Sequence, residues 1–196
     1  MSTKEKILTT ALKMISENGY SGTSIRKIAF EVGVRESAIY NHFDSKEEIL
    51  QSILAKHSKS INASEIITEE LIDLLGTPKI FLERLADKII EQWTSDNEQM
   101  LWKILLKEEI SVSLDPNYNL GTYLKNLLGL FELLFQKMSE HGFIKKIPPK
   151  ILAIQFISPF IISRMTVSNS DNKKEILDAK NNIKQHVDIF WESIKR

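Results

Sequence analysis

The 196-residue sequence has no cysteine, few turn-forming residues and no excess of charge of one sign. The lack of cysteine excludes disulfide scaffolds, cysteine-ligated zinc sites and thiol nucleophiles, and it is typical of proteins from a reducing cytoplasm. With 7 glycines and 5 prolines, the chain has too few turn residues for an all-β protein. Because the formal net charge is zero, any polyanionic partner would have to be held by locally placed cations.

Long apolar runs are missing as well. The longest uncharged apolar stretch covers residues 151–163 and is interrupted by Gln155, Ser158 and Pro159. It is shorter than the ~20 residues that cross a bilayer. The N-terminus opens with Lys4 and Glu5, unlike a signal peptide. We therefore expect a soluble cytoplasmic protein without a membrane segment.

Apolar residues recur at helical spacing along most of the chain, and no stretch alternates for long enough to predict a sheet. The first apolar stripe consists of Ile7, Leu8, Ala11, Leu12 and Ile15. It predicts a helix that ends at Gly19. A short second helix is expected after Thr23 or Ser24, because either hydroxyl can accept from the amides of a first turn. An S-x-x-E capping box at residues 45–48 predicts the start of a fourth helix.

The rest of the chain also has helical periodicity, interrupted by short breaks rich in Gly, Pro, Asn and Ser. The fold class predicted from these patterns is all-α. Helices are expected over residues 63–75, 78–95, 97–113, 120–141, 149–168 and 173–195.

Residues 25–43 have the dimensions of a helix–turn–helix. Ala29 is small enough for two helices to approach closely, and Gly33 can adopt a positive φ in the turn. The hydrophobic seat beneath the second of these helices consists of Val32, Val34, Ile39 and Phe43. The other face of residues 35–42 is polar, so this arrangement would present it rigidly to a partner.

This segment resembles the N-terminal domain of TetR-family transcriptional regulators, over roughly residues 5–55. The matching residues are Thr23-Ser24-Ile25-Arg26-Lys27-Ile28-Ala29, Val32-Gly33-Val34, Ala38-Ile39-Tyr40, His42-Phe43 and Ser45-Lys46-Glu47-Glu48-Ile49-Leu50. One departure is Arg35, where the family most often places Ser or Thr as the cap of its recognition helix. The resemblance implies a DNA-binding domain over residues 1–46, a helical ligand-binding and dimerisation domain over 47–196, and about nine or ten helices in all. It also implies a homodimer on a double-stranded DNA operator.

The resemblance further implies roles for individual residues in binding DNA. Those expected at backbone phosphates are Thr23, Ser24, Arg26, Lys27, Tyr40, His42 and Lys46. The better candidates for base edges are Arg35, Ser37 and Asn41, and Glu36 lies on the same polar face. For several of them, Arg26, Lys27 and Glu36 above all, the alternative is an ordinary solvated side chain. Residues 1–57 carry 8 Lys and Arg against 7 Asp and Glu. So weak a positive charge favours a dimer whose two DNA-binding domains bind matched half-sites over non-specific coating of DNA.

The last two expected helices carry the apolar residues of a possible dimer interface. Residues 150–168 are apolar on every side, and Pro159 would kink them, whereas 173–195 present a single seam. The residues expected at the interface are Phe156, Phe160, Ile183, Val187, Phe190 and Ile194. The alternative is that both helices pack only within the monomer.

An aromatic-rich layer in the middle of the chain could line a cavity for a hydrophobic or aromatic effector. It consists of Trp93, Met100, Trp102, Leu105, Tyr123, Leu127, Phe131 and Phe135. The alternative is a filled core.

No catalytic, metal or cofactor site is expected. The four histidines lack metal-ligand spacing, and nucleophile-elbow, P-loop and dinucleotide motifs are absent. The sequence predicts a DNA-binding transcriptional regulator, a repressor released by a small-molecule effector, rather than an enzyme. The alternative is a helical sensing or interaction protein that acts through a protein partner and binds DNA little.

Overall fold

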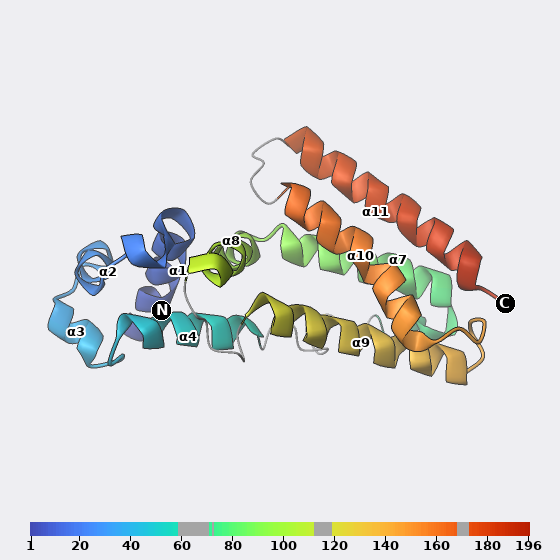
Figure 1. The fold of residues 1–196 in the computed structure, drawn as a ribbon, viewed down its shortest axis with the longest axis horizontal. Coiled ribbons are helices and arrows are strands. Elements are labelled where there is room, and N and C mark those ends of the chain that lie inside the picture. The colour runs from blue at the N-terminus through green and yellow to red at the C-terminus, as the bar shows by residue number, and fades with distance from the viewer. Residues whose placement is uncertain (59–70, 72, 112–118, 168–172) are drawn as a thin grey trace. The chain divides into compact units, whose positions relative to one another are not determined.

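The structure is a computed structural model that describes residues 1–58, 71, 73–111, 119–167 and 173–196 (Figure 1). Among these residues the regular elements are helical, apart from one isolated bridge between Ile144 and Lys195. The α-helices are α1 (Thr3–Gly22), α2 (Ile25–Val32), α3 (Glu36–Tyr40), α4 (Lys46–Ser58), α7 (Pro78–Trp93), α8 (Asp96–Ser111), α9 (Leu120–Glu140), α10 (Pro149–Val167) and α11 (Lys173–Ile194), with a 3-10 turn at Leu74–Gly76. The all-α prediction is confirmed, and most of the helix expected at 63–75 lies outside the described residues.

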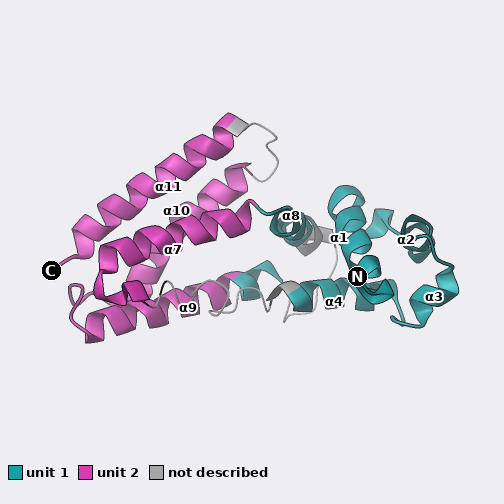
Figure 2. Ribbon diagram, turned by 180° about the vertical axis from the view of Figure 1, so that it is seen from behind, with its two compact units in different colours: residues 1–60, 95–123 teal, residues 61–94, 124–196 magenta. Residues whose placement is uncertain are grey.

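The chain forms two compact units whose segments alternate along the sequence (Figure 2). The first comprises residues 1–60 and 95–123, and the second comprises residues 61–94 and 124–196. Both α4 and α8 pack on α1, which assigns them to the same unit as the predicted helix–turn–helix. The predicted boundary after residue 46, between a DNA-binding domain and a ligand-binding and dimerisation domain, stays a prediction.

The core of the first unit is built from the apolar stripes of its short helices. Its buried side chains include Ile7, Ala11, Leu12, Ile15, Ile28, Ala29, Ile39, Phe43, Ile49, Leu50, Ile53 and Leu54. Nearly all of the apolar positions predicted for α1 are therefore buried. Burial of each large apolar side chain stabilises the fold by roughly 1.5–3 kcal/mol, and several such side chains hold the short α2 and α3 in place.

The ends of α1 differ from the prediction in two respects. Its first turn is closed by a capping box, in which the Glu5 amide donates to the Ser2 hydroxyl at 3.2 Å and the Ser2 amide donates to the Glu5 carboxylate at 2.7 Å. At Gly19 the backbone has φ 75° and ψ 166°, but helical residues resume and continue to Gly22. Gly19 is thus a break within α1 rather than its end.

In the second unit α11 packs against both α7 and α10 (Figure 1). The centre is an aromatic cluster in which Phe156 contacts Phe131, Phe135, Phe160 and Phe190, with ring centroids 5.2–5.6 Å apart. Edge-to-face and tilted pairs of this kind stabilise a core beyond the area that they bury.

The six residues predicted for a dimer interface lie inside this second unit. The exposed fractions of Phe156, Phe160, Ile183, Val187, Phe190 and Ile194 are between 0 and 4% in the single chain. In the single chain, α10 and α11 thus pack these apolar seams within the monomer, and the predicted interface stays a prediction.

By length and composition, one helix among the described residues, α10, could cross a membrane, with a mean hydropathy of 1.3 over 18 residues. The core helix of a soluble protein passes the same test. One side of α10 packs in the aromatic cluster of the second unit, and 33% of that 18-residue window is buried.

Candidate nucleic-acid interface

The turn between α2 and α3 is set by Gly33, which has φ 78° and ψ 32°. The Gly33 amide donates to the Phe30 carbonyl at 3.1 Å, and the Val34 amide donates to the Ala29 carbonyl at 2.9 Å. A residue with a Cβ atom resists this left-handed conformation, whereas glycine adopts it freely. The predicted glycine turn is confirmed, and it fixes the angle at which α3 leaves α2.

Ser24 begins α2. Its hydroxyl accepts from the Lys27 amide at 3.2 Å, which decides between the two caps that the sequence left open. Ser24, Arg26 and Lys27 are all exposed, so the first turn of α2 offers polar and cationic groups to solvent. The Lys27 ammonium also donates to the Gly22 carbonyl at 2.9 Å.

Thr23, the other cap candidate, is a buried residue. Its side chain is 2% exposed, and its hydroxyl donates to the Gly19 carbonyl at 3.0 Å. The Thr23 hydroxyl therefore satisfies a carbonyl at the break in α1. The phosphate contact predicted for Thr23 stays a prediction.

The polar face predicted for α3 lies on the surface. Only Ile39 of this helix is buried, and Arg35 at the N-cap makes no side-chain capping hydrogen bond. The exposed side chains on and beside α3 are Arg35, Glu36, Ser37, Tyr40, Asn41 and His42. Buried Ile39 and Phe43 hold the other face, so a short helix presents these groups in a fixed orientation.

Lys46 is half-buried in contacts with the chain itself. Its ammonium donates to the Tyr20 carbonyl at 2.6 Å and the Thr23 carbonyl at 2.8 Å, and it lies 3.8 Å from the centre of the Tyr20 ring. The predicted cap beside it forms, since the Glu48 amide donates to the Ser45 hydroxyl at 3.1 Å. The phosphate contact predicted for Lys46 thus competes with two hydrogen bonds inside the domain.

Phe30 is a surface residue that the sequence analysis missed. It lies on α2 four residues after Arg26, and 84% of its side chain is exposed. An i,i+4 spacing places two side chains on one face of a helix, so the position could have been identified from the sequence.

Comparisons with known proteins agree with this geometry. A family model described as bacterial regulatory proteins of the tetR family matches residues 7–53. Those residues span α2, the glycine turn and α3. Over these residues the chain is similar to the tetR family.

The curated relatives match a limited part of this chain. The HTH-type transcriptional regulator YerO of Bacillus subtilis, itself named as uncharacterized, is 37% identical over 76 residues, which are 38% of this chain and 25% of YerO. IcaR of Staphylococcus aureus, named as a negative transcriptional regulator of the biofilm operon icaADBC, is 42% identical over 48 residues, which are 24% of this chain and 26% of IcaR. The match thus spans about a quarter of the length of these relatives.

The whole TetR-like fold has a counterpart among solved structures. A crystal structure from Mesorhizobium loti, described as a TetR-family transcriptional regulator, covers 99% of this chain and 97% of its own with a TM-score of 0.76. Its sequence identity is 19%, so the likeness shows the fold alone.

The residues predicted to line an effector cavity are divided between the two units. Met100, Trp102, Leu105 and Tyr123 belong to the first unit, and Trp93, Leu127, Phe131 and Phe135 belong to the second. Most are packed against neighbours: Trp102 lies 5.9 Å from Tyr123, and Phe135 lies 5.6 Å from Phe156, between ring centroids. The predicted effector cavity stays a prediction, and the contacts described for these residues are those of a core.

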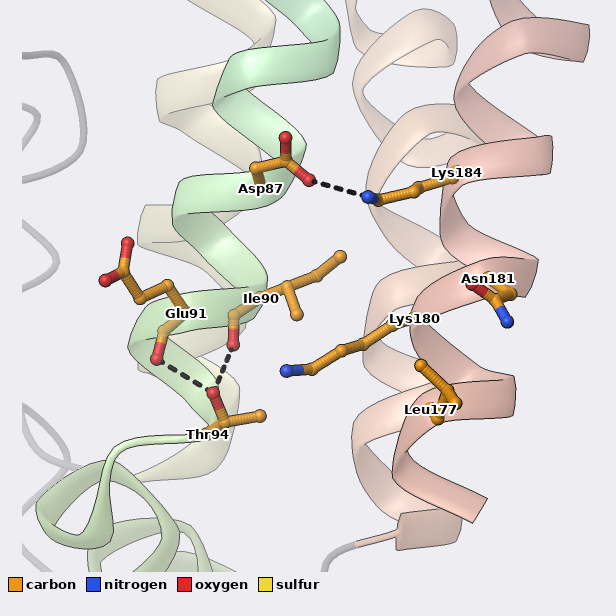
Figure 3. Close-up of a pocket in the computed structure, with 8 residues that line it drawn as sticks. All are labelled: Asp87, Ile90, Glu91, Thr94, Leu177, Lys180, Asn181 and Lys184. Carbon is orange, nitrogen blue, oxygen red and sulfur yellow. Dashed lines mark hydrogen bonds and ion pairs between the residues drawn. The ribbon is translucent and has the colours of Figure 1, made fainter. Parts of the chain in front are cut away.

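A cavity of about 270 Å³ opens elsewhere, between α7 and α11 of the second unit (Figure 3). The Asp87 carboxylate and the Lys184 ammonium form an ion pair of 3.6 Å across it, and the Thr94 hydroxyl turns back to the carbonyls of Ile90 and Glu91. The walls are charged on both sides, unlike those of the predicted aromatic cavity. Among the described residues, no group of three or more His, Cys, Asp and Glu side chains could hold a metal ion.

Proposed function

We propose that this protein is a TetR-family regulator, a sequence-specific DNA-binding protein that represses transcription from its operator. The observation that carries the proposal is the exposed polar face of α3, held by the left-handed turn at Gly33 and by buried Ile39. A helix held in this way can enter the major groove and present side chains to base edges. Repression is supported by the name of the relative IcaR, a negative transcriptional regulator that is 42% identical over 48 residues.

The contacts divide by chemistry. At the start of α2, Ser24, Arg26 and Lys27 would bind phosphates, where the amino end of the helix and two cations favour an anion. Beside α3, Tyr40 and His42 would contact the backbone.

The base edges would be read from α3 and its N-cap. Arg35 can donate in a bidentate manner to guanine, Asn41 can pair with adenine, and Ser37 is small enough to accept either kind of base pair. Glu36 can accept from the amino group of cytosine.

The functional unit would be a homodimer, with a second copy packed on an exposed apolar face of the second unit. On α10 the exposed apolar residues Ile151, Ile154, Ile162 and Met165 recur on one side of the helix, and on α11 Ile189 is 71% exposed. Contiguous exposed apolar residues on a soluble protein mark an interaction surface. A twofold pair would place two heads on the two half-sites of a palindrome.

Release from the operator by a small molecule is the third part of the proposal. TetR-family regulators are typically ligand-responsive, and the second unit has the size and aromatic content to hold a hydrophobic or aromatic effector.

Selection of bound DNA from a random duplex pool tests the function directly. We expect a palindromic sequence, bound with an affinity that falls steeply as salt concentration rises, because binding to phosphates releases counterions. Arg35→Ala should relax the preference at one base pair by about 1–3 kcal/mol, whereas Lys125→Ala, which removes an exposed cation from α9, should change nothing. A pool that yields no enriched sequence would instead favour the alternative of a protein that acts through a protein partner.

A further inference from the structure

Phe30 on α2 is the most exposed of the large apolar side chains in the part of the chain that the structure describes. Its exposed fraction is 84%, whereas the buried residues of the same helix, Ile28 and Ala29, are 0% and 2% exposed. Single exposed apolar residues are common on protein surfaces, so what surrounds this ring decides its meaning.

Helical geometry places Phe30 between two cations on the outer face of α2. Successive residues of an α-helix are turned by about 100°, so around the helix Phe30 lies between Arg26, about 40° away, and Lys27, about 60° away. All three side chains are exposed, and buried Ile28 lies about 160° from Phe30. The ring therefore shares the face of α2 that carries the proposed phosphate ligands, one turn closer to α3.

Phe30 also adjoins the turn that leads into α3. Its carbonyl accepts from the Gly33 amide at 3.1 Å, and soon after that glycine the chain reaches Arg35, the N-cap of α3. Because α2 and α3 pack on each other across this turn, the backbone that carries the ring is fixed relative to the helix proposed to read base edges. An apolar group thus lies between the cationic end and the base-reading end of one rigid motif.

Duplex DNA offers one apolar group to such a residue on the edges of its bases. This group is the 5-methyl of thymine, which lies in the major groove, and apolar contact with it is one way in which a phenylalanine distinguishes base pairs. A phosphate oxygen, by contrast, would lose hydration against the ring without a hydrogen bond in return. A partner that the two cations and the ring can bind together is therefore a strand with a thymine next to its contacted phosphates.

We propose that Phe30 is a specificity-determining residue, which packs on the methyl group of one thymine in each half-site while Arg26 and Lys27 bind the neighbouring phosphates. The inference rests on the proposed function and deepens it, because it assigns one base pair of each half-site to α2 rather than to α3. In selection from a random pool, Phe30→Ala should relax the preference for thymine at that position. The positions that α3 would read should be selected as before.

Uracil in place of thymine tests the contact from the DNA side, because it removes the methyl group and keeps the hydrogen-bonding groups of the base. The full chain is titrated with the selected palindrome, made with uracil at one symmetric pair of thymines at a time. At one pair, uracil should weaken wild-type binding by about fourfold for each half-site, the effect of one buried methyl group. Phe30→Ala should bind the thymine and uracil duplexes equally. Leu133→Ala, at an exposed apolar residue of α9, is the matched control and should keep the wild-type dependence on the methyl group.

Two outcomes would overturn the inference and leave the proposed function intact. In the first, no thymine of the palindrome shows a dependence on its methyl group in the wild type. In the second, Phe30→Ala keeps the full methyl dependence of the wild type, so that the ring does not contact the methyl group. A loss of folded protein would weaken binding to both duplexes by the same factor and is thus distinguished from a loss of the contact. A wild-type protein that selects no sequence would overturn the proposed function, and this inference with it.

Discussion

At the residue scale, Gly33 and Gly129 show that space alone does not decide what a glycine does. A Cβ atom added at either position would meet no atom within 4 Å, but only Gly33 has a positive φ, of 78°. We expect Gly33→Ala to lower the free energy of unfolding by about 1–2 kcal/mol, because an L-residue is strained in the left-handed region. Gly129→Ala in the middle of α9 should instead raise it by about 0.5–1 kcal/mol.

Denaturant titrations of both glycine variants measure these changes. Equal effects of the two substitutions would show that the turn at Gly33 contributes no conformational constraint. Gly33→Ala should also weaken operator binding, because the turn sets the direction of α3.

His186 is a titratable residue inside the aromatic cluster of the second unit. Burial lowers the pKa of its imidazole, and this outweighs the hydrogen bond between Nε2 and the Phe156 carbonyl, 3.1 Å long. In the unfolded chain the imidazole titrates near pH 6.5, so below that pH the unfolded state binds more protons than the folded state. The contribution of neutral His186 to the free energy of unfolding is complete above about pH 6.5. It is lost as the pH falls toward the lowered pKa.

We therefore expect the free energy of unfolding to decrease between about pH 7 and pH 5, and His186→Gln to flatten this decrease. Urea titrations across that range measure it, with His141→Gln, at an exposed histidine, as the control. An unchanged pH profile in His186→Gln would mean that other groups cause the acid sensitivity.

At the element scale, α3 lacks a feature that most short helices have. Its N-cap is Arg35, which makes no capping hydrogen bond, so the free amides of the first turn are left to solvent. Arg35→Ser should raise the free energy of unfolding by about 0.5–1 kcal/mol through a new cap. It should also weaken operator binding, since it removes the proposed guanine contact.

The gain in stability and the loss of operator affinity in Arg35→Ser can be measured on one protein preparation, by thermal melting and DNA titration. Arg35→Ala supplies the comparison, because it removes the guanidinium without adding a cap. If Arg35→Ser gained stability and kept full affinity, Arg35 would not contact DNA.

Helix ends were predicted well where the sequence has strong local signals. The expected ends of α7, α9, α10 and α11 lie within two residues of those observed, because Pro78, Gly142 and Pro149 interrupt the helical pattern nearby. The Gly33 turn and the exposed face of α3 were likewise predictable, since they depend on residues close in sequence. The capping box of Ser2 and Glu5 was missed, although its S-x-x-E pattern is as local as the one at Ser45.

What lies opposite a side chain could not be predicted in the same way. The seam of α11 looks the same in sequence whether it faces α10 of the same chain or a second copy, and the structure places Ile183 and Val187 in the monomer core. Lys46 was expected at phosphate because nothing in the sequence reveals the carbonyls of Tyr20 and Thr23 beside it. Long-range packing of this kind cannot be derived from periodicity alone.

At the scale of the whole molecule, the proposed dimer depends on the exposed apolar side of α10. Ile162→Glu combined with Ile154→Glu should convert the dimer to a monomer, because two buried carboxylates would have to lose their hydration. Light scattering at micromolar concentration measures the mass. Leu133→Glu, on an exposed apolar residue of α9, is the matched control and should leave the mass unchanged. A dimer that persists in the double variant would place the interface on another surface.

The hydrogen bond from the Lys107 ammonium of α8 to the Ser16 carbonyl of α1, 3.0 Å long, has a practical consequence for exchanging specificities between regulators. A chimera cut after residue 46 transplants the donor protein's recognition helices but leaves their anchor behind, in a segment about sixty residues further along the chain. The Lys107 contact would then depend on whether the foreign first helix brings a backbone carbonyl to the same place. Chimeras that receive the α8 face together with residues 1–46 should bind the donor's operator more tightly than chimeras that receive residues 1–46 alone.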